Sequence, residues 1–90
     1  MDEQARFRAS EDCEVAPFGD GVALLDLRSN VYFSLNDTGR FIFEALRDAR
    51  SAEEVVTLVA AHYDVEPDAC RDDVAALLSN LSQHGLVDRA

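Results

Sequence analysis

Residues 30–37 read NVYFSLND, and within them apolar and polar side chains alternate as they do along a β-strand. One face of this strand carries Val31, Phe33 and Leu35. The other face carries Tyr32 and Ser34. The sequence has a strand pattern before this stretch and none after it, so we expect one edge of the strand to lack a partner. Such an edge is either a hazard that the protein covers or a binding site that it uses.

The residues before this stretch predict two further strands in a meander. Residues 22–28, VALLDLR, form the better pattern, and the Ser-Asn pair that follows suits a tight turn because Asn tolerates a positive φ. Residues 13–18 form a poorer strand because Pro17 interrupts them. Residues 19–21, GDG, form the turn between the two strands.

Three helix patterns follow the strands. The first begins at Asp37, a good N-cap, and runs to about residue 50 with apolar residues at helical spacing. The second begins at Ser51, where SAEE is a capping box. The third begins near Pro67 and ends at Gly85. The order predicts an α+β fold that resembles a winged helix-turn-helix, with a three-stranded antiparallel sheet followed by three helices that cover one of its faces.

Length and charge limit the classes of function. A chain of 90 residues is expected to form one domain, and we assign residues 1–11 to a flexible N-terminal arm and residues 12–90 to the domain. The formal net charge of −10 would repel nucleic acid and attract a basic peptide. In the third helix Arg71 stands against three acidic residues, which are Asp68, Asp72 and Asp73. We therefore expect no nucleic-acid partner.

The cysteines and the hydropathy pattern predict a cytoplasmic protein. Cys13 and Cys70 lie far apart in sequence and outside any CxxC motif, so we expect free thiols. The first ten residues lack the apolar run of a signal peptide, and no apolar run approaches the length of a transmembrane helix. We therefore expect no membrane partner.

The sequence favours a binding module over an enzyme. No serine lies in a nucleophile-elbow context, and Cys70 falls on the apolar stripe of the third helix. His62 is expected at the edge of the core, and His84 lies near a helix end, where it suits the dipole. Two histidines do not make a four-ligand zinc site, and the scattered glycines form no phosphate loop. We therefore expect no catalytic residue, no metal and no cofactor.

An ordered set of features resembles the PqqD-like family. Residues 22–46, VALLDLRSNVYFSLNDTGRFIFEAL, are similar to the hairpin, junction and helix of that family, and the junction reads YFSLNDT. The Ser-Ala-Glu-Glu capping box, the Tyr-Asp-Val end of the second helix and the DDVAALLSNLSQHGLV run of the third fit as well. The resemblance covers about residues 13–89.

The resemblance implies a stand-alone recognition element for ribosomally made, post-translationally modified peptides (RiPPs). Such a protein binds the leader segment of a precursor peptide. The LDLRSNVYFSLN hairpin is most similar to proteins of lasso-peptide clusters, whose partners are a leader peptidase and a macrolactam-forming cyclase. A pyrroloquinoline-quinone or other peptide pathway stays open as an alternative. The leader would pair as an antiparallel strand with residues 31–35 and place its side chains against the third helix.

The expected leader-binding residues lie on this strand and on the third helix. They are Val31, Tyr32, Phe33, Ser34, Leu35, Asp73, Ala76, Leu77 and Asn80. The core-facing stripe of the helix is expected to be Cys70, Val74, Leu77 and Leu81, with Asp73, Ala76 and Asn80 on the flank that we assign to the groove and with Arg71, Ala75 and Leu78 on the other flank. Ala76 would leave space for a leader side chain, Asn80 could bond to the leader backbone, and Asp73 could meet a Lys or Arg.

Two other functions stay open on the sequence alone: a winged-helix regulator that binds DNA or a transcription partner, and an enzyme subunit with an unrecognised site. An exposed edge strand can also pair with a second copy of the chain, so a dimer through residues 31–35 is a further alternative.

Overall fold

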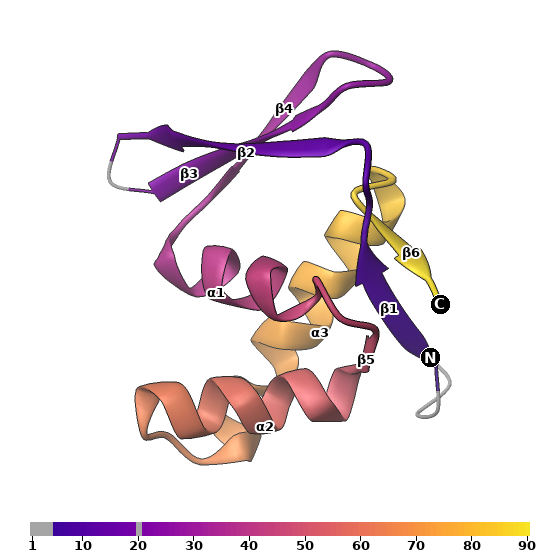
Figure 1. The fold of residues 1–90 in the computed structure, drawn as a ribbon. Coiled ribbons are helices and arrows are strands. Elements are labelled where there is room, and N and C mark those ends of the chain that lie inside the picture. Colours follow the sequence, from indigo (N-terminus) through magenta and orange to yellow (C-terminus); the bar gives the residue numbers. More distant parts are fainter. Residues whose placement is uncertain (1–4, 20) are drawn as a thin grey trace.

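The computed structural model describes residues 5–19 and 21–90 (Figure 1). In chain order the elements are β1 (Arg6–Ala9), β2 (Cys13–Phe18), β3 (Gly21–Asp26), β4 (Val31–Leu35), α1 (Asp37–Ala45), β5 (Arg50–Ser51), α2 (Ala52–Tyr63), α3 (Pro67–Gln83) and β6 (Val87–Arg89). The predicted α+β fold is confirmed, since a three-stranded antiparallel meander is followed by the three helices.

The meander β2–β3–β4 forms one layer of the fold. β3 is its central strand and pairs antiparallel with β2 on one side and with β4 on the other. Leu24 at the middle of β3 is completely buried, and it lies opposite Val15 in β2 and Phe33 in β4. Figure 1 shows this layer above α1, with α2 at the opposite end of the molecule. β4 has the predicted bounds because its alternating pattern stops where the helix pattern begins.

A second small sheet adds three strands that the sequence does not predict, and they are β1, β5 and β6. β1 lies between β5 and β6 and is antiparallel to both. Its inward side chains, Phe7 and Ala9, are buried in the core, whereas its two arginines are exposed. The structure thus differs from the expected flexible arm at β1, because Phe7 fills part of the core and the strand is paired on both sides. Residues 1–4 of the expected arm lie outside the described residues.

The cap of α1 lies one residue before the predicted cap. Asn36 is the N-cap, and its side-chain oxygen accepts a hydrogen bond from the backbone N–H of Gly39 at 2.8 Å. Asp37 is the first residue of the helix instead, where its negative charge favours the helix dipole. The cap matters for the layer arrangement because Asn36 is also the residue that joins β4 to α1.

The starts of α2 and α3 agree with the prediction. Ser51 caps α2 through a capping box, since its hydroxyl accepts from the N–H of Glu54 and its own N–H donates to the Glu54 carboxylate. Pro67 is the first residue of α3. After α3, Gly85 has a φ of 71°, and the chain then turns back to bury Leu86.

The core lies between the meander and the helices. Its largest fully buried side chains are Phe43, Leu24, Ile42, Leu46, Leu78, Leu81, Leu86, Val55, Val56 and Val74. This list corrects the stripe of α3: Leu78 belongs to the core, with Cys70, Val74 and Leu81, whereas Leu77 is only partly buried. Adjacent helical residues point about 100° apart, so Leu77 and Leu78 cannot both face the centre of the core.

Gly21 gives the first test of this packing. A Cβ at this position would overlap the carbonyl oxygen of Leu35. Gly21→Ala should therefore displace the junction between β4 and α1 and lower the free energy of unfolding by about 1–3 kcal/mol, measured by urea denaturation. Gly39→Ala is the control. Its Cβ would lie 3.0 Å from the flexible end of the Leu35 side chain, and a gain of about 1 kcal/mol in helix propensity offsets that crowding. Equal losses in the two variants would contradict this account.

The Asn36 cap gives a second test. Asn36→Ala removes the acceptor for the Gly39 N–H and should lower the free energy of unfolding by about 1 kcal/mol. Asn36→Asp keeps an acceptor oxygen at the same place and should stay close to the wild type. Urea denaturation followed by circular dichroism measures both variants. If Asn36→Asp lost as much stability as Asn36→Ala, Asn36 would not act as the cap.

Candidate functional site

β4 is an edge strand, and among residues 5–19 and 21–90 no strand pairs with its outer side. The other edge of the meander is β2, which contains Pro17; a proline is tolerated in an edge strand where its missing N–H would face solvent. The exposed fraction is 51% for Val31 and 69% for Tyr32. β4 therefore presents unused backbone donors and acceptors beside exposed side chains, as strand addition requires.

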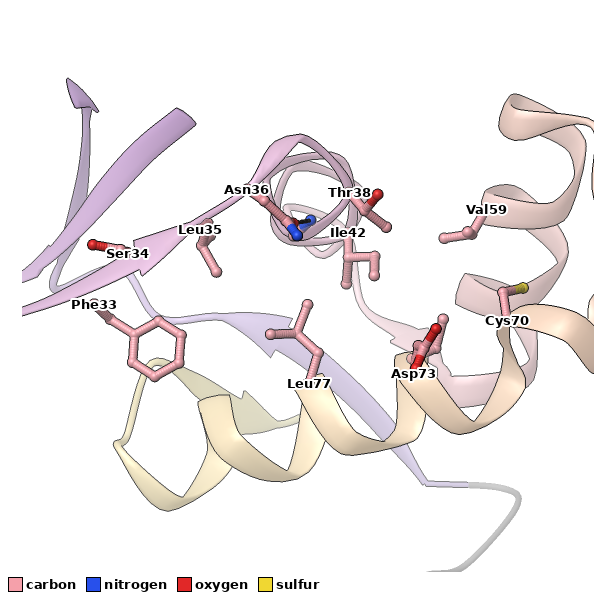
Figure 2. Close-up of a pocket in the computed structure, with 12 residues that line it drawn as sticks. Phe33, Ser34, Leu35, Asn36, Thr38, Ile42, Val59, Cys70, Asp73 and Leu77 are labelled. Carbon is pink, nitrogen blue, oxygen red and sulfur yellow. Dashed lines mark hydrogen bonds between the residues drawn. The ribbon is translucent and has the colours of Figure 1, made fainter. Parts of the chain in front are cut away.

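An open hollow of about 480 Å³ lies where the C-terminal half of β4 meets α1 and α3 (Figure 2). It is lined by Phe33, Ser34, Leu35, Asn36, Thr38, Gly39, Ile42, Val59, Cys70, Asp73, Val74 and Leu77. We call it the large hollow. Its volume falls in the range of about 300–1,000 Å³ that is usual for ligand pockets.

The large hollow has an apolar floor and a polar rim. Buried apolar side chains form the floor, and they are Ile42, Val59, Cys70 and Val74. Exposed or half-exposed polar side chains form the rim, and they are Ser34, Asn36, Thr38 and Asp73. Figure 2 shows Leu77 rising from α3 toward Ile42, with Phe33 at one end of the hollow and Cys70 at the other. This combination suits a peptide segment that buries apolar side chains and keeps its backbone near the rim.

The charge at the rim is negative. None of the residues that line the large hollow is a cation, and in the described part of the chain the Asp73 carboxylate joins no ion pair. The arginine of α3, Arg71, instead binds Glu53 of α2 at 2.8 Å and also Asp68. These two carboxylates raise the pKa of the Arg71 guanidinium above its ordinary value, and Glu53 has the larger effect. The hollow therefore favours a cationic group on whatever occupies it.

A second, smaller hollow of about 90 Å³ lies at the other half of β4. It is lined by Asp26, Ser29, Val31, Phe33, His84 and Leu86. We call it the small hollow. Phe33 lines both hollows, and its ring lies edge-on to the His84 ring with centroids 5.2 Å apart. The inward face of β4 thus borders two recesses, one on each side of Phe33.

The structure brings most of the predicted site residues to these hollows. Phe33, Ser34, Leu35, Asp73 and Leu77 line the large hollow, and Val31 lines the small hollow. Tyr32 is exposed on the opposite face of β4. Ala76 and Asn80 are exposed on α3 and line neither hollow. The predicted flank of α3 therefore borders the large hollow through Asp73, while its other two members lie farther out.

Several residues that line the large hollow were not predicted from the sequence, because the packing of α1 and α2 places them there. Asn36, Thr38, Gly39 and Ile42 come from the junction and the first turns of α1, and Val59 comes from α2. A signal for the α1 residues was present, since Thr38 and Ile42 are four residues apart and share a helix face. No signal identified Val59, because its position depends on how α2 packs behind α1.

Of the cysteines and histidines considered for catalysis, Cys70 and His84 line the hollows, whereas Cys13 and His62 lie elsewhere. Cys13 is buried, and burial raises the pKa of its thiol above the ordinary value, which opposes formation of a thiolate. The His62 ring stacks on Phe41 at 4.1 Å and lies edge-on to Tyr63. Over residues 5–19 and 21–90, no three His, Cys, Asp or Glu side chains are grouped to hold a metal ion. No helix in the same residues is long and apolar enough to cross a membrane.

Three solved structures share this fold. TbiB1 in complex with the TbiA(β) leader peptide has a TM-score of 0.76 and 28% identity, over 90% of this chain and 94% of that chain. A lasso peptide synthetase B1 complexed with the leader peptide has a TM-score of 0.74 and 35% identity, over 91% of this chain and 96% of that chain. The PqqD truncation of Methylobacterium extorquens PqqCD, a stand-alone RiPP recognition element, has a TM-score of 0.77 and 16% identity, over 98% of this chain and 94% of that chain.

Of the two sequence comparisons, the one with family models agrees with the structural relatives. A comparison with curated proteins finds no match. The family model described as coenzyme PQQ synthesis protein D, PqqD, matches residues 21–87. This match runs from β3 through the whole of α3, so the resemblance stated from the sequence is confirmed and this chain belongs to the PqqD family.

Proposed function

We propose that this chain binds the leader segment of a ribosomally made precursor peptide, which adds as an antiparallel strand to β4 and places side chains in the hollows between β4 and α3. The observation that carries the proposal is the free edge of β4 beside the large hollow. It is supported by the two structural relatives that were solved with leader peptides, one of them 35% identical over 91% of this chain.

Strand addition divides the binding free energy between two sources. Backbone hydrogen bonds along residues 31–35 provide affinity for any extended segment, and recesses for alternate side chains provide selectivity. Micromolar binding corresponds to about 8 kcal/mol. Fully burying one large apolar side chain contributes about 1.5–3 kcal/mol, so two filled recesses contribute about 3–6 kcal/mol. The backbone hydrogen bonds of the added strand have to supply the rest and offset the cost of association.

The proposed role is delivery and not catalysis. A chain that holds the leader presents the rest of the precursor to a leader peptidase, and then to a macrolactam-forming cyclase, of a lasso-peptide pathway. Tethering the substrate in this way raises its effective concentration at the enzyme without any new chemistry. The lasso-peptide assignment is supported by the 35% identity to a lasso peptide synthetase B1.

A titration with the leader tests the proposal directly. The leader half of a candidate precursor peptide from the source genome is labelled and followed by fluorescence polarisation, and backbone amide shifts are recorded in parallel. We expect saturable binding at micromolar concentration or below, with shifts concentrated at residues 31–35 and along α3. A folded sample that does not bind this leader would overturn the proposal for that peptide.

The free edge also suits a second copy of the chain. Val31 and Tyr32 are exposed along β4, so two copies could pair β4 to β4 in the absence of leader. The net charge of −10 on each copy opposes such a dimer. Sedimentation of the free protein and of the leader complex at equal concentration tests this alternative. A dimer through β4 would dissociate when the leader binds, whereas a monomeric protein would stay monomeric in both samples.

Val31 tests the use of the β4 edge. Val31→Asp places a charge on an exposed edge position beside the small hollow, and we expect leader binding to weaken by about tenfold or more, equivalent to at least about 1.4 kcal/mol. Val65→Asp is the matched control, because Val65 is 43% exposed between α2 and α3 and lines neither hollow. Circular dichroism and urea denaturation establish that both variants are folded. Wild-type affinity in a folded Val31→Asp variant would argue against strand addition at β4.

Two adjacent aspartates test the charge of the large hollow. Asp73 lines the hollow, whereas its exposed neighbour Asp72 does not. Asp73→Asn should weaken leader binding by about three- to tenfold if the leader places a cation there, and Asp72→Asn should leave the affinity unchanged. The difference between the two variants should shrink as salt is raised, because salt screens exposed charge pairs. Equal effects of both variants would mean that only the overall charge of the protein matters.

A further inference from the structure

Arg28 joins the β3–β4 hairpin to the end of α3. It lies in the turn of the hairpin, and its Nη2 donates a hydrogen bond to the carbonyl oxygen of Gly85 at 2.7 Å. Gly85 is the positive-φ residue that follows α3. A Cβ on Gly85 would lie 2.9 Å from the same Nη2, so the missing side chain leaves room for the guanidinium. We call Asp26, Arg28 and Gly85 the hairpin clamp.

Asp26 orients the guanidinium of Arg28. Its side chain is 8% exposed, and the carboxylate accepts from the Arg28 backbone N–H at 3.0 Å, from Arg28 Nε at 3.4 Å and from the Ser29 hydroxyl at 3.1 Å. These hydrogen bonds hold the pKa of Asp26 below its ordinary value, and the bond from the backbone N–H of Arg28 has the largest effect. The Asp12 carboxylate approaches Arg28 Nε at 3.6 Å from the segment before β2. With Nε turned toward these carboxylates, Nη2 of the planar guanidinium reaches the end of α3.

The two ends of β4 are held in different ways. At the Leu35 end the chain passes directly into α1, whose Ile42 and Phe43 are buried, so connectivity fixes the strand there. At the Val31 end the contacts with the α3 terminus include the edge-on packing of Phe33 against His84 and the hydrogen bond from Arg28 to Gly85. The small hollow lies in this second region. Because β3 pairs with β4 along its whole length, loss of the clamp would let the β3–β4 hairpin tilt as a unit about its Leu35 end, and the Val31 end would move most.

We propose that the hairpin clamp sets the separation between β4 and α3 and thereby sets the affinity for the leader; this inference rests on the proposed function. In strand addition, the inward side chains of the added strand have to contact α3, which requires a particular separation between β4 and α3. The clamp fixes that separation before the leader binds. Such preorganisation contributes affinity because the ordering cost is not incurred on binding. Arg28 is a positioning residue, since it lines neither hollow and acts through β4.

The test compares three arginine variants in the full chain. Arg28→Gln removes the fork that joins Asp26 to Gly85, and Arg28→Lys keeps the charge but offers one ammonium group in place of the fork. Arg47→Gln is the control: it makes the same change of charge, and Arg47 pairs with Glu44 of α1, far along the chain from the hairpin. Each variant is titrated with the labelled leader. Its free energy of unfolding is measured by urea, and the His84 ring-proton shifts of the free protein report the position of the Phe33 ring.

We expect Arg28→Gln to stay folded and to bind the leader about tenfold more weakly, as the loss of a hydrogen bond to a charged group predicts. Its His84 ring protons should shift in the absence of leader, because Phe33 moves away from His84. Arg28→Lys should lie between this variant and the wild type in both measurements. Arg47→Gln should bind within about twofold of the wild type and leave the His84 protons in place.

The outcomes separate this inference from the proposed function. If the wild type binds the leader and folded Arg28→Gln binds it equally well, the clamp does not set affinity and the inference is overturned. If the wild type fails to bind, the proposed function is overturned, and the affinity part of the inference is overturned with it. Unchanged His84 ring protons in Arg28→Gln would overturn the positioning role whatever the leader does.

Discussion

β4 has to pack Phe33 and Leu35 against the rest of the molecule while the hydrogen-bonding groups along one backbone edge stay unused, and the other elements support that condition. β3 pairs with β4 along its whole length, from Val31 to Leu35, so the strand is ordered without a second partner. The edge stays accessible because the chain turns at Asn36 into α1 and does not add another strand. An edge of this kind invites pairing with other chains, and the net charge of −10 discourages pairing with another copy.

The elements that create this condition could be predicted because their signals are local. Strict alternation over residues 31–35 defined β4, and the change of period after it defined α1. The capping box at Ser51 and the proline at Pro67 marked the starts of α2 and α3. Each of these signals lies within a few residues of the feature that it predicts. The order of these elements was then sufficient for the α+β class, whereas the family resemblance came from the residues themselves, above all those of the hairpin and the junction at 22–46.

The features that were missed depend on contacts between distant segments. β1 is short and carries two arginines, and it is a strand because β5 and β6, more than 40 and 75 residues later, supply its partners. The adjacent leucines Leu77 and Leu78 are equivalent in sequence, and only the packing of α3 decides that Leu78 enters the core while Leu77 borders the large hollow. Hollows are spaces left by the packing of several elements, so no pattern within one element could have predicted that Val59 lines the large hollow.

On the proposed mode of binding, selectivity has to come from side chains, because the backbone edge of β4 suits any extended segment. The recesses on the two sides of Phe33 differ: the large hollow has an acidic residue, Asp73, at its rim, and the small hollow has a smaller volume and is lined by His84. A slip of one residue would turn every inward side chain of an added strand to the opposite face, so unequal recesses select a register as well as a sequence. Each residue of an added strand advances by about 3.3 Å, so a defined register also fixes where the precursor leaves the hairpin. On the same proposal, an enzyme that acts on one bond downstream would need that distance to be constant, and the junction at Leu35 together with the contacts at the Val31 end would provide it.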